Sequence, residues 1–194
     1  MLGQRACRTF TDEPVDDDDL AALVEAATHA PSAENAQPWV FVVVREPSAR
    51  EAIVRLTQQV WHGGARAHAE TTLDSSFLAS IDAFVERGYG GAPVLVVVAG
   101  DTNRAASTAV LASSVYPAVQ NLLLAAGALG YGSSMTTLAA QVPDALADIV
   151  DLPVGVRPFA VVPVGRPATA LGPPHRRPVA EVAHRDRYGV PFIP

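Results

Sequence analysis

Three short, almost entirely apolar runs constrain the fold of this chain most strongly. They are rich in β-branched residues and cover residues 39–44, 93–99 and 159–164. Continuous apolar runs of this length are typical of strands that are buried on both faces of a sheet. We therefore predict three buried strands, and Pro163 indicates that the third lies at a sheet edge or ends there.

Helical patterns separate these strands. Apolar residues recur at helical spacing, so we expect helices at about 17–30, 48–61, 106–129 and 143–150. Pro117 should kink the longest of them or break it. Residues 62–90 favour a loop followed by a helix, and residues 132–138 form a short separate segment. A length of 194 residues fits a single domain over 1–194, and its Pro- and Arg-rich tail, 172–194, should be extended.

Lysine is absent, and all 14 basic residues are arginine. Schiff-base aldolases, pyridoxal-phosphate enzymes, Ser-Lys hydrolases and P-loop nucleotidases each need an amine, so these classes are excluded. One cysteine, Cys7, and histidines without metal-binding spacing predict no disulfide and no metal site. The net charge of −6 argues against nucleic-acid binding. No leader or membrane span is recognisable, so we expect a cytoplasmic protein without membrane contact.

Two arginine-rich segments offer a site for an anion. Arg5 and Arg8 stand three residues apart near the start, and Arg176 and Arg177 lie in the tail. The planar guanidinium group binds phosphate through two parallel hydrogen bonds. A solvated surface explains such arginines equally well, so neither segment decides the function alone.

Two further segments offer a lining for a ring-shaped ligand. Ser32, Asn35 and Gln37 stand between a helix end and a strand, and their hydroxyl and amide groups suit the edge of a heteroaromatic ring. Residues 130–137 combine hydroxyl side chains with glycines, which permit close approach of the backbone. The plain alternatives are a capped turn for the first segment and a helix C-cap with a turn for the second.

Together, these segments resemble the FMN-dependent nitroreductase family over nearly the whole chain. The family motif A-P-S-x-x-N-x-Q-P-W matches at every fixed position of residues 30–39. The opening element R-R-S-x-R-x-F is similar to residues 4–10, where Gln4 and Ala6 replace its first arginine and its serine. A G-x-G follows at Gly130 and Gly132, and an arginine precedes a proline at residues 176–178.

The resemblance implies an α+β fold, with a central mixed or antiparallel sheet flanked by helices and FMN at a homodimer interface. It implies a phosphate and ribityl site at Arg5, Ala6 and Arg8, completed by Arg176 and Arg177. The implied flavin contacts are Pro31, Ser32, Ala33, Asn35 and Gln37 from across the dimer, and Met135, Thr136 and Thr137 near flavin N5. Many members place lysines near the N1/O2 edge of the flavin, so here Arg8 is expected to take that role as well.

The implied activity is that of an NAD(P)H-dependent oxidoreductase. NADH or NADPH would reduce FMN at N5, leave, and be replaced by a small-molecule acceptor such as a nitroaromatic, a quinone or an enone. The cofactor carries the chemistry, so no catalytic side chain is expected. Residues 62–90 would form a variable lid that shapes the choice of acceptor. Two alternatives stay open: an FMN-binding or FMN-sequestering protein with little turnover, and a flavin-destructase-like oxidation of reduced FMN itself.

Overall fold

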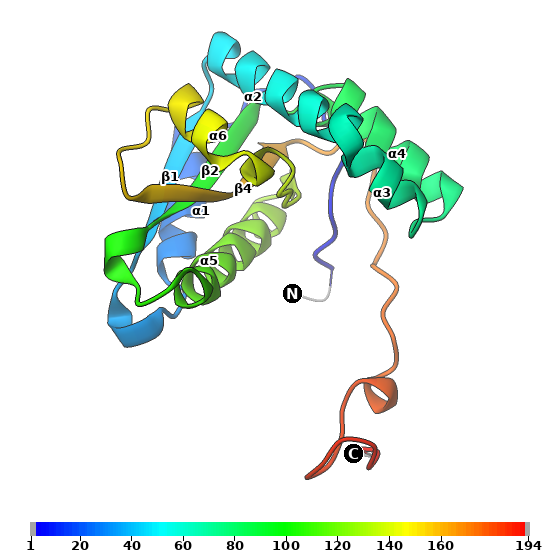
Figure 1. The fold of residues 1–194 in the computed structure, drawn as a ribbon. Coiled ribbons are helices and arrows are strands. Elements are labelled where there is room, and N and C mark those ends of the chain that lie inside the picture. Colours follow the sequence, from blue (N-terminus) through cyan, green and yellow to red (C-terminus); the bar gives the residue numbers. More distant parts are fainter. Residues whose placement is uncertain (1–2, 193–194) are drawn as a thin grey trace.

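A four-stranded sheet with helices on both faces forms the centre of the molecule (Figure 1). The structure is a computed structural model that describes residues 3–192. The strands are β1 (Trp39–Val44), β2 (Val94–Asp101), β3 (Gly132–Ser133) and β4 (Val156–Gly165), in the spatial order β1-β2-β4-β3. Each neighbouring pair is antiparallel, so the α+β fold is confirmed and its sheet is antiparallel rather than mixed.

Both faces of the sheet are buried because its side chains alternate between two cores. The covering helices are α1 (Asp17–Thr28), α2 (Pro47–Val60), α3 (Arg66–Glu70), α4 (Ser75–Glu86), α5 (Thr108–Ala128) and α6 (Pro143–Ile149). Val96 and Val98 of β2 pack with α1 and α5, whereas Leu95 and Val97 pack with α2, α4 and α6. This two-sided burial explains why the strand sequences are apolar throughout.

Helix α5 is the apolar core helix of one face. By length and composition it is the one helix within residues 3–192 that could cross a membrane. Val115 and Leu122 are fully buried in the core, whereas Tyr116 and Leu129 are 38% and 40% exposed. The helix continues through Pro117, so the predicted alternative of a break does not occur. Core packing therefore explains the apolar composition of α5, and Tyr116 remains partly exposed on its outer side.

The region of residues 62–90 is more helical than predicted. A π-helical turn spans Trp61–Ala65, and α3 and α4 follow it. We predicted a loop here because two adjacent glycines, Gly63 and Gly64, usually interrupt a helix. Instead the chain makes one wide turn, in which Gly64 adopts a φ of +143° that other residues rarely reach.

Pro163 lies inside β4, which is flanked by β2 and β3, so its predicted place at an edge or strand end is wrong. Thr136 pairs with Val161 beyond the end of β3, and the same antiparallel register places Ser134 opposite Pro163. Proline has no N–H to donate at this point. The ladder is therefore interrupted, and the backbone around Ser134 lies outside the strand.

The tail after Gly172 runs away from the sheet and its helices as an extended strap (Figure 1). Arg5 holds its start by donating to the Gly172 carbonyl at 3.2 Å. Further along, Val179 and Tyr188 are 60% and 92% exposed. The strap thus presents apolar side chains that its own protomer does not cover.

Candidate functional site

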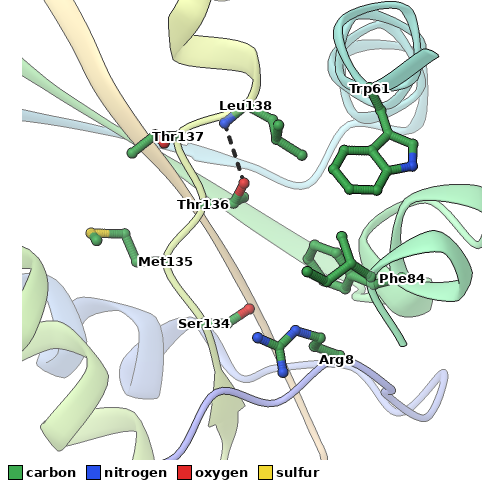
Figure 2. A pocket seen from close by; sticks show the side chains of 9 residues that line it. Arg8, Trp61, Phe84, Ser134, Met135, Thr136, Thr137 and Leu138 are labelled. Carbon is green, nitrogen blue, oxygen red and sulfur yellow. Dashed lines mark hydrogen bonds between the residues drawn. The ribbon is translucent and has the colours of Figure 1, made fainter. Parts of the chain in front are cut away.

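A cavity of about 250 Å³ opens where the interrupted end of β3 faces the π-helical turn and α4. Figure 2 shows Trp61 and Phe84 on one side, the segment from Ser134 to Leu138 on the other, and Arg8 at one end. The lining residues are Arg8, Trp61, Ile81, Phe84, Ser134, Met135, Thr136, Thr137 and Leu138. The cavity therefore unites the opening segment, the segment after the G-x-G and the region of residues 62–90.

The segment after the G-x-G gives the cavity its hydroxyl groups. Thr136 is fixed by paired backbone hydrogen bonds to Val161, at 2.9 and 3.0 Å, and its own hydroxyl accepts from the Leu138 amide at 3.3 Å. Ser134 is 5% exposed, and its Oγ finds no hydrogen-bond partner among the described residues. A buried hydroxyl without a partner is costly, so this atom is suited to a polar ligand.

Arg8 supplies the positive charge of the cavity, and it alone is charged among the lining residues of the described chain. Its guanidinium carbon lies 4.8 Å from the centre of the Phe77 ring on α4, a cation–π distance. Burial, and then the nearby charge of Arg5, lower the pKa of Arg8 from its ordinary value. The group remains a cation at neutral pH because an arginine pKa is so high. It can therefore compensate a negative charge inside the cavity.

The opening segment is held against the end of β3. Ala6 forms a parallel bridge with Ser133, and the Cys7 amide donates to the Ser133 carbonyl at 2.9 Å. This pairing orients Arg8 into the cavity, whereas Arg5 contacts the start of the tail. The structure thus brings Arg8 together with Met135, Thr136 and Thr137, and places Arg5 and Ala6 just outside the lining.

The segment from Pro31 to Gln37 does not line this cavity. Ala33 donates to Ser114 of α5 at 3.2 Å. Ser32 accepts from the Gln37 amide at 3.0 Å, and the Gln37 side chain donates to Asn35 at 3.2 Å. Left-handed φ values of +54° and +47° at Asn35 and Gln37 hold their side chains in a tight, exposed turn. The segment is therefore ordered, but a ligand in the cavity of its own protomer would not touch it.

The two tail arginines also lie apart from the cavity lining. Arg176 donates to the neighbouring His175 carbonyl at 2.9 Å, and Arg177 pairs with Glu181 at 3.1 Å. Both side chains are exposed. Within one protomer the structure does not join them to Arg8, so their role at a phosphate stays a prediction.

Sequence reasoning missed the aromatic side of the cavity. Trp61 and Phe84 line it from the π-turn and α4, and are 3% and 5% exposed. The apolar spacing of Ile81 and Phe84 predicted their helix but not the surface that they face. Ser134 belongs to the predicted lining segment of residues 130–137, although it was not among the individually predicted flavin contacts. Residues 3–192 contain no group of three or more His, Cys, Asp or Glu side chains placed to hold a metal ion.

These residues fit the flavin that the sequence resemblance implies. The cavity has a cation for the electron-rich edge of the ring, an unpaired hydroxyl, backbone released from the sheet by Pro163, and apolar walls. Each group suits a planar, heteroaromatic molecule with polar edges. Arg8, Ser134 and Thr136 are the residues best placed to hold it.

Comparison with known proteins agrees with this fit. A family model described as the nitroreductase family matches residues 1–166. An NADH dehydrogenase of Thermus thermophilus is 29% identical and covers 93% of this chain and 91% of its own length. An FMN reductase [NAD(P)H] of Bacillus subtilis is 26% identical, and the match covers 97% of this chain and 72% of the length of that protein. A nitroreductase-type protein of Desulfovibrio desulfuricans, solved in complex with FMN, is 26% identical and superposes with a TM-score of 0.75. This match covers 96% of the present chain and 94% of that protein.

Proposed function

Because the chain belongs to the nitroreductase family, we propose that it is an FMN-dependent NAD(P)H oxidoreductase with ping-pong turnover. Its acceptors would be small conjugated molecules such as nitroaromatics, quinones or enones. The observation that carries the proposal is the cavity in which Arg8 and the unpaired Ser134 hydroxyl face aromatic walls. Relatives named for FMN and NAD(P)H support the choice of cofactor and donor.

The protein's own contribution is binding and electrostatics. When bound, FMN supplies the redox chemistry by taking a hydride at N5 from NAD(P)H and passing two electrons on to the acceptor. Arg8 would stabilise negative charge at the N1/O2 edge of the flavin. The Ser134 hydroxyl and the backbone of residues 134–137 would hydrogen-bond the other polar edge. Trp61, Ile81 and Phe84 would shield the flavin from water.

We propose that a second copy of the chain completes the site. Asn35 and Gln37 are exposed on their own protomer and away from its cavity. Tyr116 on α5 and Val179 in the strap after Gly172 are exposed apolar side chains that would gain from a covering surface. A homodimer would supply that surface, bring Pro31 to Gln37 to the flavin of the partner, and bring Arg176 or Arg177 near a phosphate.

A spectroscopic titration tests the proposed function. The purified protein should be yellow with bound FMN, and NADH or NADPH added without oxygen should bleach the absorbance near the flavin maximum. A quinone should restore the colour and sustain NAD(P)H oxidation. Failure to take up added FMN would refute the proposal. Bound FMN that neither donor reduces would favour a sequestering protein, and loss of the flavin itself upon reoxidation would favour the destructase-like alternative.

A further inference from the structure

We propose that Phe77 is a positioning residue, whose ring holds the Arg8 guanidinium toward the cavity and thereby strengthens the preference of the site for reduced over oxidised FMN. The inference rests on the proposed function and deepens it by naming a residue outside the cavity lining that acts on the cofactor through Arg8. Its evidence is the cation–π contact between the two side chains, in a part of the structure where Arg8 has no other polar partner among residues 3–192.

The backbone of Arg8 is fixed on both sides of the residue. On one side, the Cys7 amide donates to the Ser133 carbonyl at 2.9 Å. On the other side, the Phe10 amide donates to the Gly90 carbonyl at 3.0 Å. The two segments lie so close together that a Cβ at Gly90 would collide with the Arg8 carbonyl oxygen. The point from which the Arg8 side chain starts is therefore well defined, and only its long, flexible stem leaves the direction of the charged group open.

The charged group of Arg8 lies over an aromatic ring instead of pairing with an acid. Within residues 3–192 it has neither a carboxylate nor a hydrogen-bond acceptor as a partner, although the side chain is partly buried. Its guanidinium carbon lies 4.8 Å from the centre of the Phe77 ring. The face of such a ring attracts a cation but accepts none of the five N–H donors in the guanidinium plane. Phe77 therefore fixes the group and leaves its donors available to an anionic ligand.

Phe77 is itself held in place at the start of α4. Its amide donates to the side chain of Asp74, the N-cap of the helix, at 2.9 Å. Further along α4, Asp82 accepts from the Trp61 indole N–H and from Arg66, each at 2.9 Å. These bonds tie α4 to the π-helical turn and to α3. The ring at position 77 is therefore carried by a helix whose own place is fixed.

The helical repeat places Phe77 on the side of α4 that faces the cavity. Ile81 and Phe84 line the cavity, and they follow Phe77 at spacings of four and seven residues, the repeat of one helix face. Phe77 is not part of the lining, and its side chain is 38% exposed. It thus supports Arg8 from outside, at the end of the cavity where Arg8 lies (Figure 2).

The charge of the flavin determines what a fixed Arg8 does. Hydride transfer oxidises NAD(P)H to NAD(P)+ and delivers two electrons and one proton to FMN, which thereby gains one negative charge. Arg8 is the one charged residue among the described residues that line the cavity. A guanidinium that is held toward the cavity therefore stabilises the reduced flavin more than the oxidised flavin. Loss of the Phe77 ring should weaken the binding of reduced FMN selectively and lower the midpoint potential of the bound flavin.

Flavin binding and flavin potential in Phe77 variants test the inference without turnover. Fluorescence titration gives the Kd of oxidised FMN, and the midpoint potential of the bound flavin, measured against a reference dye, then gives the Kd of reduced FMN. Phe77→Leu should lower the preference for reduced FMN by about two- to fivefold, the strength of an exposed cation–π contact. Phe77→Trp keeps a ring face and should retain the preference. Phe41→Leu makes the same exchange at a partly buried residue of β1 and should leave the preference unchanged.

Fluorinated phenylalanines at position 77 test the same contact without a change of shape. Each added fluorine withdraws electron density from the ring face, so the attraction for a cation weakens step by step. The preference for reduced FMN should therefore fall in order from phenylalanine through its mono-, di- and trifluorinated forms. This series tests the inference even if Phe77→Leu fails to fold.

The outcomes separate this inference from the proposed function. An unchanged preference in Phe77→Leu and throughout the fluorinated series would overturn the inference and leave the oxidoreductase intact. An equal loss of preference in Phe41→Leu would overturn it as well, because the effect would then come from general destabilisation. If FMN binds but neither NADH nor NADPH reduces it, the proposed function fails, and the role of Phe77 is still decided by chemical reduction with dithionite. If the protein takes up no FMN, both fail.

Discussion

At the scale of single residues, the Ser134 hydroxyl should affect the stability of the fold and the binding of FMN in opposite directions. Its hydroxyl is buried without a partner among the described residues, which weakens the folded state in the absence of a ligand. We predict that Ser134→Ala raises the free energy of unfolding of the FMN-free protein by about 1 kcal/mol and weakens FMN binding by about 1 kcal/mol, because one hydrogen bond to the flavin is lost. Thermal or urea unfolding measures the first effect, and fluorescence titration with FMN measures the second.

Ser114 provides the matched control. It is also a buried serine, but its hydroxyl accepts from the Ala33 amide at 3.2 Å and donates to the Val110 carbonyl at 3.3 Å. Ser114→Ala should therefore lower the free energy of unfolding, by about 1 kcal/mol. Equal destabilisation by Ser134→Ala and Ser114→Ala would contradict the role assigned to Ser134.

At the scale of elements, the sequence predicted what local patterns determine. The predicted strand at 39–44 is β1 itself, and the other two strands and four helices differ from the structure by a few residues at their ends. A strand that is buried on both faces has a continuous apolar sequence, which can be recognised without knowing which strands lie beside it. The π-turn and the place of Pro163 gave no such signal. Gly64 supplies the unusual φ of the wide turn at an exposed position with open space around it. Pro163 is tolerated in β4 because the facing chain at Ser134 leaves the ladder.

The residues of the candidate site also fall into those that local sequence patterns predict and those that they do not. Arg8 and Thr136 belong to motifs that are continuous in sequence, so they could be predicted. Trp61 and Asp82 meet only after α2, α3 and α4 pack, and their pairing spans 21 positions of the chain. A tertiary hydrogen bond between helices leaves no periodic trace in one sequence. The aromatic side of the cavity therefore had to come from the structure.

The α3–α4 region should carry a pH-dependent part of the stability. Hydrogen bonding to Arg66 outweighs burial and lowers the pKa of Asp82 below its ordinary value. A lowered carboxylate pKa stabilises the folded state above the unfolded pKa of about 4, and this contribution is lost as the pH falls through the folded value. Asp82→Asn should thus cost on the order of 1 kcal/mol at pH 7 and progressively less below pH 4, as measured by urea unfolding.

A substitution of Arg66, the partner of the Asp82 carboxylate, tests whether this ion pair causes the pH dependence. In an Arg66→Met background, Asp82 no longer has the cation that favours its charged form. The cost of Asp82→Asn should therefore lose most of its dependence on pH when it is measured in that background. A cost of Asp82→Asn that stays constant from pH 7 to about pH 3 in the presence of Arg66 would show that packing, and not the charge, links these helices.

At the scale of the whole molecule, the proposed site is divided between two parts of the surface. Arg8 lies in the cavity, whereas Asn35 and Gln37 lie in an exposed turn beside α5. If two copies exchange these parts, each flavin depends on Arg8 of one protomer and on Asn35 and Gln37 of the other. Such a shared site makes a prediction that no single-chain site can satisfy.

We predict complementation between two inactive variants. Arg8→Ala and the double variant Asn35→Ala/Gln37→Ala should each lose most FMN binding and NAD(P)H oxidation. Refolding them together at equal amounts should restore about a quarter of the unmodified activity, because half of the dimers are mixed and each mixed dimer has one intact site out of two. Two affinity tags isolate the mixed dimer, whose activity should then be about half of the unmodified value. An inactive mixed dimer would place Arg8 and the 35–37 turn at the same flavin within one protomer, because only a site shared across the interface can be repaired by mixing. Full activity of the double variant by itself would instead exclude the turn from the site.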